Sequence, residues 1–239
     1  MPIPSPRSLI PNFVTCLGLA CAGYAIFLIT EGNLILGGTL VIITALMDGI
    51  DGELARRLSA SSELGVQLDS LADVVCFGVA PAVLMIQYLR GTDVPSAAIG
   101  ISALIFLLCS ALRLARFNTL VPTSSNKDSL GLPTTGAGSY LALVIYLDYQ
   151  SSGQFLTPIA IPLVAIILSA LMVSEIRFLS KTGRKGLMIA SLIITVILGI
   201  FISLPLAGLI FLTLHIAHGL LRAVRELWPT MSRGLRKIR

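Results

Sequence analysis

Apolar stretches, each about as long as a membrane-crossing helix needs, follow one another along almost the whole chain. Hydrophobic residues make up 55% of the 239 residues and charged residues 12%, and the mean hydropathy is +0.92. Typical soluble domains are about 45 to 50% apolar and about 25% charged. The sequence therefore predicts a polytopic membrane protein.

Windows of about 20 residues pick out about eight candidate spans. They run from Asn12 to Ile29, Leu34 to Arg57, Leu64 to Leu89, Ser96 to Leu120, Pro133 to Tyr149, Phe155 to Phe178, Leu187 to Ser203 and Leu206 to Leu221. Short connections, with no repeat and no low-complexity run, predict a single all-α helical bundle over residues 1–239. Residues 1–11 are expected to lie along the membrane interface, and residues 222–239 to form a basic tail.

Basic residues fall almost entirely on one side of this arrangement. Of the 17 Lys and Arg residues, Arg90 is the exception. The positive-inside rule makes the basic side cytoplasmic, with both termini there, in the cytoplasmic membrane. Topology alone accounts for the net charge of +5, so no nucleic-acid partner is predicted.

Four aspartates lie inside the second and third predicted spans. Asp48 and Asp51 are three residues apart and share one helix face, while Asp69 and Asp73 are four apart and share another. Each carboxylate costs about 2.5 to 3.5 kcal/mol at the centre of a membrane helix. Counted from the turn between the spans, Asp51 and Asp69 lie at similar depth, with the other two one turn deeper. Two antiparallel helices would gather all four into a cage for hard cations such as magnesium or manganese.

Small residues beside the acids suggest what such a cage serves. Two divalent cations held by shared carboxylates are a known device for in-line displacement at phosphorus. Gly52, Ala55 and Gly65 leave room for a flat ligand, and Arg56 can offer a bidentate fork to a phosphate. The same small residues also suit plain helix packing. An ion-coupled transporter, in which the acids mark an ion path, is the alternative from another class of function.

The string DGIDGELARRLSASSELGVQLDSLAD, from Asp48 to Asp73, reads D-x2-D-G-x2-A-R-x8-G-x3-D-x3-D. It resembles the signature of the CDP-alcohol phosphotransferases at every fixed position. The resemblance implies a homodimeric enzyme with a cytosol-facing site that binds a CDP-linked lipid through two divalent cations. It also implies that Asp48, Asp51 and Asp69 are the principal metal ligands, and that Asp73 touches metal and accepts the proton of the attacking hydroxyl. The positions that would accommodate the cytidine and diphosphate are Gly52, Ala55, Arg56 and Gly65.

Two further strings bear on the acceptor alcohol. LRLARFN places Arg113 and Arg116 on one helix face, followed by Asn118, with Arg113 roughly level with the carboxylates. These arginines also satisfy the positive-inside rule if they merely snorkel to the interface. GLPTTGAG opens the fifth span with the hydroxyls of Thr134 and Thr135 at the same membrane face. All five side chains are therefore candidates for binding the acceptor.

These strings, with IPNFVT near the amino terminus and FGVAPA after Asp73, resemble the phosphatidylserine synthase branch of the family. That resemblance implies transfer of a phosphatidyl group from CDP-diacylglycerol to L-serine, with release of CMP. Inositol phosphate, glycerol phosphate and an archaetidylserine-type lipid stay open as alternatives. Synthases of phosphatidylglycerol phosphate tend to carry an arginine where Gly18 follows Asn12 and Thr15, which counts modestly against glycerol phosphate.

Overall fold

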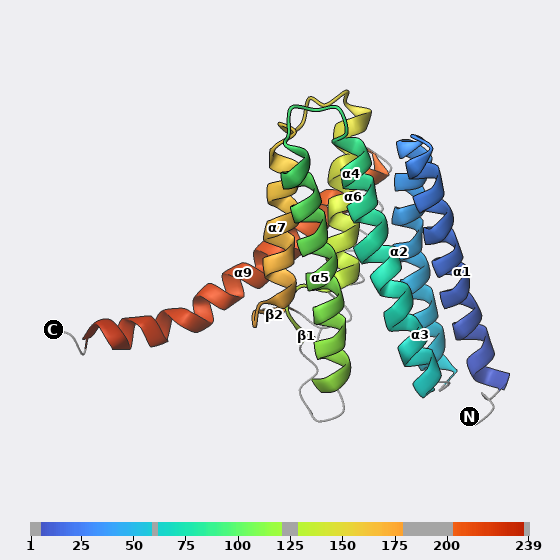
Figure 1. The fold of residues 1–239 in the computed structure, drawn as a ribbon. Helices are drawn as coiled ribbons and strands as arrows, with labels where there is room; N and C mark the ends of the chain where they lie inside the picture. The colour runs from blue at the N-terminus through green and yellow to red at the C-terminus, as the bar shows by residue number, and fades with distance from the viewer. Residues whose placement is uncertain (1–5, 59–61, 121–128, 179–202, 237–239) are drawn as a thin grey trace.

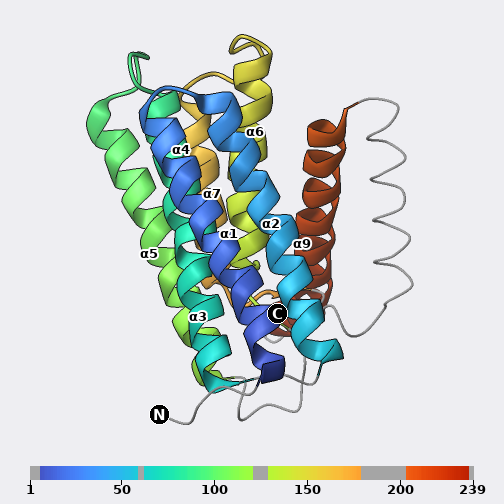
Figure 2. The same cartoon turned by 90° about the vertical axis from the view of Figure 1, so that its right-hand side faces the viewer.

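A computed structural model gives the arrangement of the chain and describes residues 6–58, 62–120, 129–178 and 203–236. Within these ranges the chain is helical, apart from its connecting turns and one pair of two-residue strands. Figure 1 and Figure 2 show long helices lying side by side in an upright bundle. The prediction of a helical bundle is confirmed, and the strand pair is an addition that the sequence did not predict.

The first two helices form a hairpin. Helix α1 spans Pro6–Thr30 and helix α2 spans Leu34–Arg57. The turn between them holds Gly32 at φ 86°, a left-handed conformation that glycine adopts without steric penalty. Both predicted spans are found, and the first begins earlier than expected. The hairpin forms because each helix buries apolar side chains against the other along its length.

The third predicted span is one continuous rod of three helical segments. Helix α3 spans Glu63–Asp73, the π-helical segment η1 spans Val74–Val79, and helix α4 spans Ala80–Tyr88. The acid-bearing ends of α2 and α3 lie at the same end of the bundle as the start of α1 (Figure 1). Single π-helical turns within α-helices are rare and are frequently found at functional sites. This one begins directly after Asp73.

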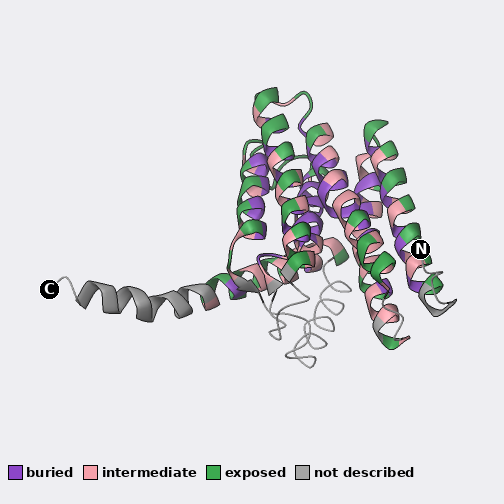
Figure 3. Ribbon diagram, turned by 60° about the horizontal axis from the view of Figure 1, so that its bottom comes forward, coloured by how far each residue is buried: buried purple, intermediate pink, exposed green. Residues whose placement is uncertain are grey.

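Three further helices complete the bundle: α5 at Ser96–Leu120, α6 at Thr134–Gln150 and α7 at Ala160–Val173. Helix α5 packs against α7, while α6 packs against α2 and α4. Buried residues gather where these helices meet, as Figure 3 shows. The largest side chains of this core include Phe77, Leu84, Met85, Phe106, Leu141 and Ile161. Segment η1 contacts α5 and α6 at this core, whereas α3 packs mainly against α1.

The sixth predicted span, Phe155 to Phe178, is too long at both ends. Helix α7 has 14 residues and stops at Val173. After it the chain becomes extended, and strand β2, Arg177–Phe178, pairs antiparallel with strand β1, Ser129–Leu130. These strands link the two loops that enter α6 and leave α7. Apolar composition alone could not reveal that the last apolar residues belong to a strand.

Helix α9 spans Leu204–Arg236 and contains the eighth predicted span. It packs on α6 and β2 and then runs obliquely away from the bundle (Figure 1). The seventh predicted span lies, apart from Ser203, outside the described residues. In the described ranges, the stretches long and apolar enough to cross a membrane are Leu9–Thr30, Leu34–Ala55, Glu63–Tyr88, Ser96–Thr119 and Leu204–Arg222. These are five, so the count of about eight spans stays a prediction.

Large apolar side chains cover the outside of the bundle. Phe13, Leu71 and Leu112 are 69%, 66% and 61% exposed, although each lies in the middle or near the end of a long apolar helix. Contiguous apolar surface of this extent is unfavourable in water and favourable against lipid chains. The chain is therefore an integral membrane protein.

Asp148, near the end of α6, explains why α7 starts later than predicted. The residue is 1% exposed, and its carboxylate accepts a hydrogen bond from the Tyr88 hydroxyl at 2.7 Å. It also accepts bonds from the backbone N–H groups of Phe155 and Leu156 at 2.9 and 3.0 Å. Because these N–H groups are bound by a side chain, the segment is held as a loop.

We expect Asp148→Ala to destabilise the fold by about 2 to 4 kcal/mol, because it removes the acceptor for three partly buried donors. Thermal unfolding of the purified protein should show a melting temperature at least about 5 °C lower. Asp93→Ala is the matched control, since Asp93 is an exposed acid in the loop between α4 and α5. Equal melting temperatures for the two variants would contradict this role of Asp148.

Candidate functional site

Three of the four aspartates form one cluster. Asp48 and Asp51 come from α2 and Asp69 comes from α3, and one carboxylate oxygen from each lies within 4.8 Å of the others. Asp51 is 5% exposed, while the other two are half-buried. An all-oxygen, negatively charged donor set is the one that hard divalent cations such as magnesium and manganese prefer. The cluster therefore fits a divalent cation, which would offset the cost of holding three carboxylates at this depth.

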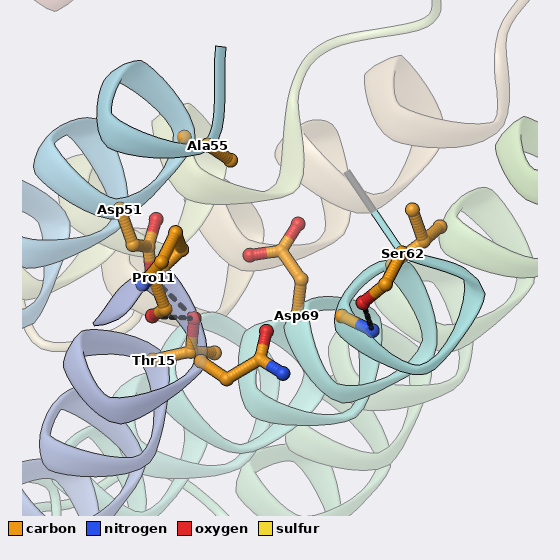
Figure 4. A pocket seen from close by; sticks show the side chains of 10 residues that line it. Pro11, Thr15, Asp51, Ala55, Ser62 and Asp69 are labelled. Carbon is orange, nitrogen blue, oxygen red and sulfur yellow. Dashed lines mark hydrogen bonds between the residues drawn. The ribbon is translucent and has the colours of Figure 1, made fainter. Parts of the chain in front are cut away.

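Threonine hydroxyls support two of these carboxylates from neighbouring helices. The Thr15 hydroxyl of α1 lies 2.8 Å from Asp51 Oδ2, and 3.1 Å from the carbonyl oxygen of Pro11 as an alternative acceptor (Figure 4). The Thr135 hydroxyl of α6 donates to Asp48 Oδ2 at 3.2 Å. Hydrogen bonds of this kind orient metal ligands. Thr135 was predicted as an acceptor residue, and here it contacts the acid cluster.

Thr15 is a site residue that the sequence reasoning missed. It is 8% exposed and sits among apolar residues of α1. The available signal was the pair Asn12 and Thr15, which are three residues apart and therefore share a face of the first span. Two polar residues on one face of an apolar helix, near the same end as the acids, indicate a position beside them.

We expect Thr15→Val to weaken Mn²⁺ binding about 10- to 100-fold, because Asp51 loses the hydroxyl that orients it. Mn²⁺ titration of the purified protein, followed by electron paramagnetic resonance, measures this without any turnover. Thr39→Val is the control, since the Thr39 hydroxyl donates to the Ile35 carbonyl within α2. Unchanged Mn²⁺ affinity in Thr15→Val would show that this hydroxyl does not organise the site.

A hollow of about 100 Å³ opens beside the cluster. Figure 4 shows Asp51 and Asp69 facing each other across it, with Ala55 and Ser62 at its rim. The lining residues are Pro11, Asn12, Thr15, Asp51, Gly52, Ala55, Ser62, Gly65, Val66 and Asp69. Gly52, Ala55 and Gly65, three of the four residues predicted to accommodate the cytidine and diphosphate, thus line one hollow beside Asp51 and Asp69. The side chain of the fourth, Arg56, lies outside the described part of the chain.

Gly65 keeps part of this hollow open. A Cβ atom at this position would lie 2.9 Å from Asn12 Oδ1 and 3.1 Å from Ser62 Oγ. Ser62 caps α3, because its hydroxyl accepts a hydrogen bond from the Gly65 N–H at 3.1 Å. Any side chain here would therefore press on the helix cap and on α1, and would narrow the space beside Asp69.

Asp73, the last residue of α3, lies outside the group of three. The charges of Asp48, Asp69 and Arg113 all act on its carboxylate. Asp73 therefore lies within electrostatic range of both the acid cluster and Arg113 of α5. The group whose carboxylate oxygens all lie within 4.8 Å of one another is Asp48, Asp51 and Asp69, so a direct metal contact by Asp73 stays a prediction.

Arg113 is a buried cation near the aspartates. It is 8% exposed, and its Nη1 donates to the Thr134 hydroxyl at 3.1 Å. Its guanidinium carbon lies 5.7 Å from the ring centroid of Phe117, within range of a cation–π contact. Arg113 and Thr134, from α5 and α6, thus form a polar pair inside the bundle, within electrostatic range of Asp73.

Two other residues predicted to bind the acceptor make contacts elsewhere. Arg116 donates from Nη1 to the carbonyl of Val173 at 2.9 Å and from Nη2 to that of Ser174 at 3.0 Å. It therefore neutralises the C-terminal end of α7. Asn118 donates from Nδ2 to the Ser70 hydroxyl at 2.9 Å. These contacts tie α5 to α7 and to α3.

Fold and site together define a helical membrane protein with a carboxylate cluster beside a small hollow in the bundle. The chain belongs to the CDP-alcohol phosphatidyltransferase family, whose model matches residues 8–172. This confirms the family resemblance read from the string between Asp48 and Asp73.

Curated relatives cover almost the whole chain. A CDP-diacylglycerol–serine O-phosphatidyltransferase of Helicobacter pylori is 31% identical over 230 residues, which is 93% of each chain. A protein of the same name from Methanocaldococcus jannaschii is 31% identical over 90% of this chain and 94% of its own. An archaetidylserine synthase of Methanothermobacter thermautotrophicus is 32% identical over 71% and 69%. Two of these names thus give a serine O-phosphatidyltransferase, and the third gives a synthase of archaetidylserine.

Proposed function

We propose that this protein is a phosphatidylserine synthase, which transfers a phosphatidyl group from CDP-diacylglycerol to the hydroxyl of L-serine and releases CMP. The observation that carries the proposal is the cluster of Asp48, Asp51 and Asp69 beside a hollow lined by Gly52, Ala55 and Gly65. Relatives named for this reaction match the chain nearly end to end. The ion-path alternative accounts for the acids and the hollow, but it gives no reason for the match to relatives named for this reaction.

Each part of the site has a task in this reaction. The hollow and Arg56 hold the cytidine diphosphate head group, while the acyl chains lie along the apolar outside of the bundle. When bound to the aspartates, two divalent cations, magnesium or manganese, neutralise the diphosphate and make the acceptor hydroxyl easier to deprotonate. Asp73 accepts the proton as the serine oxygen bonds to the lipid-side phosphorus and the bond to CMP breaks.

Serine fits the polar pair on the other side of Asp73. Its carboxylate would pair with Arg113, and the Thr134 hydroxyl would complete its binding site. A phosphorylated acceptor such as inositol phosphate would need several cations. Near Arg113 the chain carries two more cations that could serve this purpose, Arg116 and Lys127. Arg116 binds two backbone carbonyls, and Lys127 lies outside the described residues. The balance of contacts therefore favours serine.

The site faces the cytosol in this proposal, because the acids lie near the membrane face at which the sequence concentrates its basic residues. Both termini would lie on that side of the cytoplasmic membrane. The homodimer implied by the family resemblance is part of the same proposal, and cross-linking in the native membrane tests it.

The decisive assay is CMP release by the purified protein with CDP-diacylglycerol and one acceptor at a time. We expect release with serine and Mg²⁺ or Mn²⁺, and little with inositol, inositol phosphate or glycerol phosphate. Preference for another acceptor would overturn the assignment to serine. No release with any acceptor, from protein that still binds Mn²⁺, would favour the ion-path alternative.

A further inference from the structure

We propose that Gly138 is a positioning residue that sets the place of Asp73 through the π-helical segment η1. This inference rests on the proposed function for its kinetic part. Gly138 lies on α6, four residues after Thr134, and touches neither the acid cluster nor the hollow. Its effect would be transmitted through the backbone of η1.

The backbone of η1 lies so close to Gly138 that there is no space for a side chain at this position. A Cβ atom at Gly138 would lie 2.5 Å from the Phe77 carbonyl oxygen and 2.7 Å from the Phe77 Cα. Backbone atoms cannot rotate away as the end of a flexible side chain can. Phe77 is itself 1% exposed, within the buried core. Any residue larger than glycine at position 138 would therefore push η1 away from α6.

A second contact holds η1 from the side of α5. A Cβ atom at Gly78 would lie 2.9 Å from Ser110 Oγ and 3.2 Å from Leu107 Cδ1. The Ser110 hydroxyl is fully buried and has no hydrogen-bond partner among the described residues. The segment is thus confined between α5 and α6 by two glycine contacts.

These contacts lie close to the residues that would bind serine. Ser110 is three residues before Arg113 on α5, and Gly138 is four residues after Thr134 on α6, so each pair shares a helix face. Asp73 directly precedes η1. The same helix faces that confine η1 therefore carry Arg113 and Thr134. The two glycine contacts fix the separation between the proton acceptor and the acceptor-binding pair.

The test compares Gly138→Ala with Gly136→Ala, where a Cβ atom meets nothing within 4 Å. Misplacement of a reacting group by about 1 Å can cost about 100-fold in rate. We expect Gly138→Ala to lower kcat roughly 10- to 100-fold while the KM for CDP-diacylglycerol and the Mn²⁺ affinity stay within about threefold. Gly136→Ala should match the wild type. Equal kcat for Gly138→Ala and the wild type would overturn the proposal. So would a variant in which CDP-diacylglycerol binding and Mn²⁺ binding are weakened as much as kcat.

A second pair of variants guards against simple misfolding. Gly78→Ala should also lower kcat, and adding Ser110→Ala should restore part of it by removing the Oγ atom that the new methyl group meets. Failure of Ser110→Ala to restore any activity would contradict the confinement of η1.

Structures of the Gly138→Ala and Gly136→Ala proteins separate this proposal from the proposed function. The Asp73 carboxylate should move relative to Arg113 in the first variant and stay in place in the second. An unmoved Asp73 in both would overturn the positioning role, whichever alcohol the enzyme uses. If Asp73 is displaced in Gly138→Ala but the wild-type enzyme uses an acceptor other than serine, the positioning role stands and only the choice of serine is overturned.

Discussion

Asp73→Asn is expected to lower kcat by about 100- to 10,000-fold, because an amide cannot accept the proton of the attacking hydroxyl. The expectation follows from where this side chain lies. Asp48, Asp51 and Asp69 form the cluster that fits a cation, and Asp73 stands beside it, next to Arg113. Replacing Asp73 therefore removes a proton acceptor while leaving the three-carboxylate group in place.

The measurement is CMP release, together with binding of CDP-diacylglycerol and Mn²⁺ to the same preparations. Asp73→Asn should keep measurable binding of both. Asp69→Asn is the informative comparison, because it removes a member of the cluster and should weaken Mn²⁺ binding as well as turnover. Turnover near the wild-type rate in Asp73→Asn would remove this residue from its role.

Sequence could predict most of the helices because a membrane span has a simple requirement. Every backbone polar group must be satisfied within the segment, so a long apolar run becomes a helix. The start of α7 escaped this rule, because the Asp148 carboxylate at the end of α6 accepts hydrogen bonds from the N–H groups of Phe155 and Leu156 and holds them in a loop. The π-helical turn after Asp73 escaped it too, because the apolar run Val74–Val79 reads as ordinary helix, and its close contacts with α5 and α6 come from distant parts of the chain.

In the site, too, local spacing predicted some features, while contacts between distant parts of the chain set others. Spacings of three and four residues, with one hairpin, were enough to predict that Asp48, Asp51 and Asp69 meet. The same reasoning placed Asp73 in one cage with them, which stays a prediction, and it placed Arg113 at the depth of the carboxylates, where its charge acts on Asp73. Nor could spacing alone distinguish Arg113 from Arg116, because both lie on one helix face. The two differ because Arg116 donates hydrogen bonds to carbonyls at the C-terminal end of α7.

Arg113→Gln is expected to lower kcat/KM for serine by about 30-fold to several thousand-fold. Removing one partner from a buried, hydrogen-bonded charge pair costs about 2 to 5 kcal/mol, which corresponds to this range. The loss should appear mainly as a higher KM for serine, with the KM for CDP-diacylglycerol nearly unchanged. Arg113→Lys should retain part of the affinity, because it keeps the charge but loses the planar fork.

Arg116→Gln is the matched control, three residues further along the same helix face. Because Arg116 binds the carbonyls of Val173 and Ser174, its loss should lower the melting temperature while the KM for serine stays within about threefold. The opposite pattern, with serine affinity lost in Arg116→Gln and kept in Arg113→Gln, would move the acceptor pocket to the end of α7. An equal loss in both variants would require a site wide enough to reach both guanidinium groups, as a phosphorylated acceptor would need.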